Sequence, residues 1–154
     1  MANQGVIGFY QITKTIKDQL LDDVNVNTVT TGDITDIDLA KQTMYPLSHF
    51  IVNNVTLEEN IYRFNISVLA MDIVDQSKEA TTDIFKGNNN EQDVLNTQLV
   101  VLNKLIQVLR MGTLYQNKYQ LDGDPTCEPF YDRFENQVGG WACTFDVLIQ
   151  NDIN

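Results

Sequence analysis

The sequence has few of the residues on which most catalytic, metal and redox sites depend. It contains a single histidine, His49, and two cysteines, Cys127 and Cys143, which do not form a CxxC pair. None of its three serines lies in a GxSxG context, and neither GxxxxGK[ST] nor GxGxxG occurs. A lone imidazole needs an oriented partner and a nucleophile before it can act as a catalytic base. We therefore expect no enzyme, no catalytic residue and no cofactor.

Positive charge is also scarce. The chain contains ten Lys and Arg residues and 21 Asp and Glu residues, which gives a formal net charge of −11. The acidic residues are spread along the whole chain. Without a basic patch, direct binding to nucleic acid is not expected, although the protein can still lie near DNA. The longest apolar run, around Leu99–Leu102, is too short to cross a bilayer. The N-terminal residues lack the features of a secretory signal peptide. We therefore expect neither a signal peptide nor a membrane partner.

The composition that remains is that of a globular protein. Apolar residues make up 43% of the 154 residues and charged residues 20%, which fits one domain spanning residues 1–154. His49 lies inside a β-like run, where it is expected to pack in a sheet or at the surface. The two cysteines are expected to be buried free thiols, with a disulfide across two paired strands as the alternative.

Acidic clusters are the remaining candidates for chemistry. Asp33, Asp36 and Asp38, or Asp122 and Asp124, could supply oxygen ligands to Ca²⁺, but neither group has the spacing of an EF-hand loop. Solvated acidic loops are the simpler interpretation, and no metal site is predicted. An enzyme with a Ca²⁺- or carboxylate-based site at 33–38 and 122–128 stays open as a minor alternative.

Two helices are predicted from hydrophobic periodicity. The first covers Phe9–Val24, where apolar residues recur at three- to four-residue intervals. The second begins after Asn90, a good N-cap, and runs to Arg110. Its apolar stripe consists of Leu95, Leu99, Leu102, Ile106 and Leu109, which we expect to face a sheet.

The strands are predicted as two hairpins. Leu47–Thr56 and Ile61–Val74 are separated by a short polar turn, and a short strand is possible at Thr28–Thr31. After a loop that holds Asp122–Pro125, a strand over Cys127–Asn136 is expected to pair with the run that ends at Gln150, with Gly139 and Gly140 between them. The predicted fold is α+β: an antiparallel sheet of two hairpins, a long helix packed on one face and an additional N-terminal helix.

The order of elements resembles that of small neck and tail-completion proteins of tailed bacteriophages. An N-terminal helix leads to "YPLSHFIVNNVTLEENIYRFNISVLAMDIVD", then to "NEQDVLNTQLVVLNKLIQVLRM" and to the closing "FYDRFENQVGGWACTFDVLIQ". The ending, with Gly139, Gly140 and Trp141, carries the resemblance best. These neck and tail-completion proteins include the tail terminators and the ring proteins between the portal and the tail.

The resemblance implies a structural virion protein rather than an enzyme. Such a protein forms a homomeric six- or twelve-fold ring in the neck or tail, as a head–tail connector or tail terminator, and is assembled in the host cytoplasm. Its partners are the neighbouring portal, connector or tail proteins, and double-stranded DNA passes through without specific binding. Asp33, Asp36 and Asp38 are the candidate channel-lining residues. The alternative is a small soluble protein-binding or regulatory module that is not part of a virion.

Overall fold

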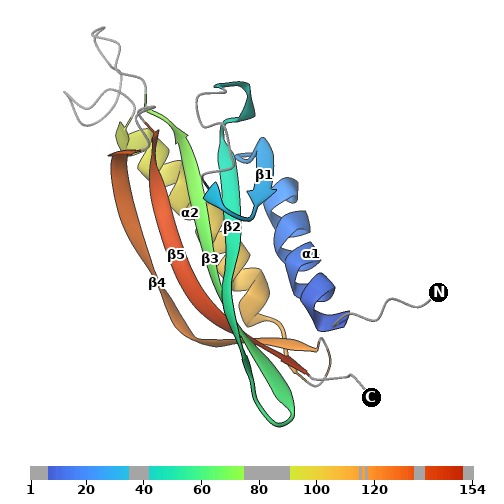
Figure 1. The fold of residues 1–154 in the computed structure, drawn as a ribbon. Helices are drawn as coiled ribbons and strands as arrows, with labels where there is room; N and C mark the ends of the chain where they lie inside the picture. Colours follow the sequence, from blue (N-terminus) through green and yellow to red (C-terminus); the bar gives the residue numbers. More distant parts are fainter. Residues whose placement is uncertain are drawn as a thin grey trace, which may run out of the picture.

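The computed structural model describes residues 7–34, 42–74, 91–114, 116, 118–133 and 138–150. Within them the chain forms two α-helices, a short 3-10 helix and a five-stranded sheet (Figure 1). In chain order the elements are α1 (Ile7–Asp22), β1 (Thr28–Thr31), η2 (Gln42–Met44), β2 (Leu47–Leu57), β3 (Ile61–Ile73), α2 (Glu91–Arg110), β4 (Tyr119–Arg133) and β5 (Val138–Gln150). The predicted α+β class is confirmed.

The sheet has the strand order β1-β2-β3-β5-β4. The two predicted hairpin pairs, β2 with β3 and β4 with β5, are antiparallel, and β3 pairs with β5 to join them. The expectation of a purely antiparallel sheet is wrong, because β1 pairs with β2 in parallel. A parallel partner became possible because the chain leaves β1 and returns through η2 before β2 begins.

Both helices pack on one face of the sheet and bury the main core between the two layers (Figure 1). The helices contribute the side chains that recur at helical spacing, and β3 and β5 contribute alternate residues. The fully buried large side chains of this core include Ile12, Ile16 and Leu20 of α1, Leu102, Leu105 and Leu109 of α2, Ile66 of β3 and Ile149 of β5. A smaller cluster on the opposite face joins Leu47, Met71 and Phe130 to Tyr45.

The predicted stripe of α2 is correct except at one position. Leu99 is 40% exposed, while Gln98 is fully buried. The buried side of α2 is wide, because Val94, Val101 and Leu105 also face inward. Trp141 of β5 fixes the helix to the sheet, since its Nε1 donates a hydrogen bond of 2.7 Å to the carbonyl oxygen of Leu95.

Two local predictions near the C-terminal hairpin are wrong. Asp122–Pro125 lie within β4 rather than in a loop, where an irregularity between Asp122 and Thr126 accommodates the extra residues. Gly139 and Gly140 lie inside β5 rather than between the strands. Gly140 is needed for a close approach to β3, because a Cβ atom there would lie 2.0 Å from the carbonyl oxygen of Ala70.

Candidate functional site

The sheet face opposite the helices carries a network of hydrogen-bonded polar side chains. Asn53 of β2 donates from Nδ2 to Asn65 Oδ1 and to Ser67 Oγ, at 2.8 Å in each case. Asn65 Nδ2 in turn donates to Asp146 Oδ1 at 2.8 Å, and the hydroxyls of Ser67 and Thr144 are 2.8 Å apart. Three neighbouring strands are therefore tied together on a surface that is polar and hydrated.

Arg63 organises the acids at one end of this face. Its guanidinium bonds Asp122 of β4, and it lies 3.5 Å from Glu58 and 3.9 Å from Asp146. The hydrogen bond with Asp122, together with the charge of Glu58, raises the pKa of Arg63 above its ordinary value. The cation is thus held by carboxylates, so it does not offer a free positive charge to a phosphate backbone.

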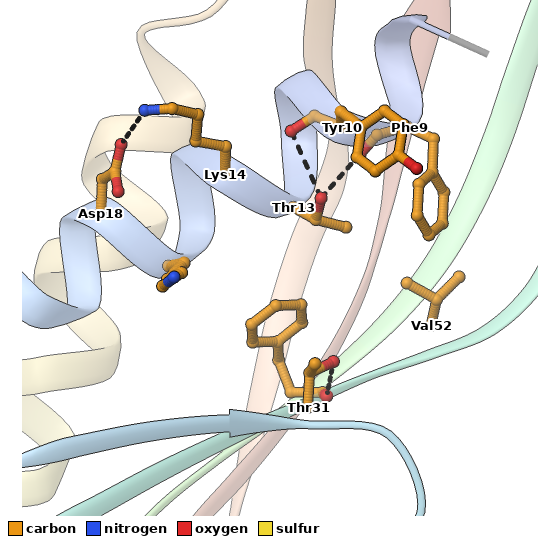
Figure 2. A pocket seen from close by; sticks show the side chains of 9 residues that line it. Phe9, Tyr10, Thr13, Lys14, Asp18, Thr31 and Val52 are labelled. Carbon is orange, nitrogen blue, oxygen red and sulfur yellow. Dashed lines mark hydrogen bonds and ion pairs between the residues drawn. The ribbon is translucent and has the colours of Figure 1, made fainter. Parts of the chain in front are cut away.

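A groove lies between α1 and the β1–β2 edge (Figure 2). It has a volume of about 460 Å³. Its walls are mainly apolar, and polar side chains stand at its rim: the lining residues are Phe9, Tyr10, Thr13, Lys14, Lys17, Asp18, Thr31, Phe50 and Val52. Figure 2 shows the ring of Phe9 directed toward Val52, and Lys14 bonded to Asp18 along the helix at 3.1 Å.

His49 is buried in the sheet, which is one of the two positions expected for it. Its Nδ1 lies 2.7 Å from Thr30 Oγ1 and its Nε2 lies 2.7 Å from the carbonyl oxygen of Gly32. A carbonyl only accepts, so Nε2 carries the proton and Nδ1 accepts from the Thr30 hydroxyl. Burial lowers the pKa of His49 below its ordinary value of 6.5, although the bond to Gly32 and the charge of Asp33 raise it. The imidazole is a neutral structural link between β1 and β2.

The two cysteines are free thiols, as expected, and they face each other across β4 and β5. Cys143 is fully buried in the main core, whereas Cys127 is partly exposed. Burial, with a smaller contribution from the adjacent Cys127, raises the pKa of Cys143 to about 12. A thiol with such a pKa is a poor nucleophile at neutral pH, so Cys143 is not a candidate nucleophile.

The structure describes three of the five acidic residues singled out in the sequence. Asp33 is exposed two residues after β1, while Asp36 and Asp38 lie outside the described residues. Asp122 is held by Arg63, and Asp124 accepts a hydrogen bond of 3.0 Å from Arg110. Among the residues that the structure describes, no group of three or more His, Cys, Asp or Glu side chains could hold a metal ion. No described helix is both long and apolar enough to cross a membrane.

The groove and the Arg63 cluster were not found from the sequence. The polar residues of β3, Arg63, Asn65 and Ser67, stand at alternate positions, which is the pattern of a strand with one hydrated face. That pattern could have indicated the polar network, but not its partners on β4 and β5. No protein-family model matches the sequence, and no significant match occurs among curated proteins.

Proposed function

We propose that this protein is a structural component of a tailed-bacteriophage virion. It forms a homomeric ring in the neck or tail, as a head–tail connector or tail terminator, and joins portal or head to tail around the DNA channel. The observation that carries the proposal is the element order: α1, the β2–β3 hairpin, the long α2 and the β4–β5 hairpin follow one another as the resemblance implies.

The surface chemistry supports a passive role beside DNA. The formal charge is −11, and two of the arginines, Arg63 and Arg110, are paired with carboxylates. A duplex that slides through a ring is repelled by such a surface rather than held, because phosphate binding needs unpaired Lys and Arg. The proposal assigns no catalytic residue, no metal and no cofactor.

The first test is the mass of the purified full-length chain. A ring predicts a species of six or twelve times 17.5 kDa by native mass spectrometry or light scattering, with closed rings in electron micrographs. A protein that stays a monomer or a dimer at every concentration would contradict the ring.

A second candidate function is favoured by the groove between α1 and β2. An open, mainly apolar groove of about 460 Å³ is within the size range of a ligand or peptide site. A small binding module that uses it would remain a monomer or dimer and would gain thermal stability with its ligand. The same mass measurement therefore separates the two functions. The position of the gene, among or away from portal, capsid and tail genes, provides an independent check.

A further inference from the structure

The sheet has an open edge along half of β2. The short strand β1 pairs only with Leu47–Phe50, and its contact ends where the Gly32 N–H donates to the Phe50 carbonyl oxygen at 3.3 Å. From Ile51 to Leu57, β2 has no strand on its outer side in the described part of the chain. An open edge of this kind is a template for another strand.

The hydrogen-bond pattern shows which β2 residues direct their backbone outward. The Phe50 carbonyl faces β1, whereas the N–H of Glu58 faces β3, where it bonds the Ile61 carbonyl oxygen at 3.0 Å. The register with β3 shifts by one residue between Val52 and Asn54, so the alternation is counted back from Glu58, and Val55 and Leu57 direct their backbone groups outward. Their side chains are 38% and 74% exposed, although their register partners on β3, Phe64 and Tyr62, are buried. This stretch offers both unpaired backbone groups and apolar side chains.

The other end of the sheet, β4, is complementary to this edge. The Lys118 carbonyl accepts from the Gln150 N–H at 3.1 Å and therefore faces β5, so Tyr119 and Leu121 direct their backbone outward. Through β5 and β3, Tyr119 lies in register with Leu57, and Leu121 with Val55. Further along β4, Pro129 lies in register with Ser48, which β1 already covers. The part of β4 that can donate hydrogen bonds thus lies level with the part of β2 that is free.

Strand direction and charge agree with a contact between these two edges. β4 runs antiparallel to β2, because the strands β2, β3, β5 and β4 alternate in direction. A rotation about an axis parallel to the strands keeps these directions. A neighbouring copy related by such a rotation therefore presents its β4 antiparallel to β2. The groove beside β2 is lined by Lys17 together with the Lys14–Asp18 ion pair, while Glu128 is exposed on β4. Pairing two β2 edges would instead bring Lys17 of both copies together.

We propose that β4 of a second copy of this chain pairs with the open edge of β2 and closes the outer side of the groove. The contact is head-to-tail, because it uses two different surfaces, and repetition around an axis gives a ring. This inference rests on the proposed ring and names the surfaces that join its subunits. Each interface adds backbone hydrogen bonds at Val55 and Leu57 and removes their side chains from water.

Cysteine cross-linking of the full-length chain tests the contact. Thr56→Cys in β2 and Gln120→Cys in β4 introduce exposed thiols beside the outward-facing residues of each edge. A mixture of the two variants should give a covalent dimer with a short bismaleimide, whereas each variant alone should match the wild type, which controls for Cys127. The double variant should give a ladder that stops at six or twelve subunits.

Each other outcome overturns a stated part of the inference. Cross-linking of Thr56→Cys alone would mean that two β2 edges pair in a symmetric dimer. Rings without the mixed cross-link would leave the ring standing and reject this interface. Monomers without any cross-link would reject both the interface and the ring.

A backbone variant separates edge pairing from mere proximity. Val55→Pro removes an outward-facing N–H, and proline is tolerated at such an edge position, so the subunit should keep its melting temperature. Its association should weaken about tenfold or more, while Val55→Thr, which keeps the N–H and the branched shape, should assemble like the wild type. Equal assembly of Val55→Pro and Val55→Thr would contradict strand pairing at this edge.

Discussion

His49 shows how a single side chain holds the smallest strand of the sheet in place. Its ring bonds Thr30 and the Gly32 carbonyl, so both nitrogens are used within β1 and the residue that follows it. β1 has only four residues and borders the groove through Thr31. The neutral imidazole therefore helps to set where β1 ends and where the free edge of β2 begins.

The first prediction is a pH dependence that comes from His49. Burial lowers its pKa in the folded state below 6.5, so the unfolded chain binds the proton more readily. The stabilising contribution is present above pH 6.5 and is lost as the pH falls through the lowered folded pKa. Urea unfolding between about pH 5 and pH 8 should show the free energy of unfolding decreasing toward acid, in the range where His titrates.

The control for this prediction is His49→Gln, which removes the titration and keeps an amide that can donate to Gly32. The chain has no second histidine, so the variant should lose the part of the pH dependence that sets in as the pH falls below about 6.5. An identical slope in both proteins would show that His49 does not carry the effect.

At the scale of the element, α2 packs across both hairpins. Its buried side chains contact β3, β5 and β4, and its Leu95 carbonyl accepts the bond from Trp141. Gln98 is fully buried, and neither polar atom of its amide has a hydrogen-bond partner among the described residues. A buried amide without partners costs stability, so α2 is held mainly by apolar packing.

The second prediction compares two leucines of α2. Leu102 is fully buried and Leu99 is 40% exposed, so Leu102→Ala should lower the free energy of unfolding by about 2–5 kcal/mol. Leu99→Ala should lower it by about 1 kcal/mol or less, because it leaves little cavity. Urea unfolding of both variants measures the difference. Similar losses at the two positions would mean that Leu99 is covered in solution, which an interface between subunits would explain.

At the scale of the whole molecule, charge is the dominant property. The chain carries −11 overall, Asp33 is exposed beyond β1, and the carboxylates of the polar sheet face surround Arg63. A ring of such subunits multiplies the negative charge around its axis. If the subunits form the proposed ring, duplex DNA is expected to pass without adhering, because the net negative charge repels the phosphates.

The third prediction tests whether the segment at 33–38 faces the channel. Replacing Asp33, Asp36 and Asp38 by lysine adds two charge units at each position, which changes the subunit from −11 to −5. If the segment lines the channel, the variant ring should bind duplex DNA with strongly salt-dependent affinity, and particles that carry it should eject slowly at low salt. DNA binding by mobility shift and ejection at several salt concentrations are the measurements.

The matched control places lysine at Asp22, Glu59 and Asp93, which are exposed positions outside this segment with the same charge change. This control should bind DNA more weakly than the first variant. Equal binding would assign the effect to net charge alone, and normal ejection by the first variant would remove the segment from the channel wall.

The sequence by itself determined the local elements of this protein. The 3–4 spacing after Asn90 and the alternation in Ile61–Ile73 and in the final strand depend only on neighbouring residues, so α2, β3 and β5 were predicted close to their observed bounds. Charge and the scarcity of histidine, cysteine and serine motifs likewise needed no fold. These properties come from residues that are near one another in the chain.

The tertiary structure alone decided how these elements meet. The parallel pairing of β1, the free edge of β2 and the bond from Arg63 to Asp122, 59 residues away, depend on long-range strand order, which a local pattern does not encode. Leu99 is exposed and Gln98 is buried for the same reason, because the surfaces that pack on a helix decide which side is buried. The groove exists only where α1 crosses the end of β1, so its lining residues could be found only once both were placed.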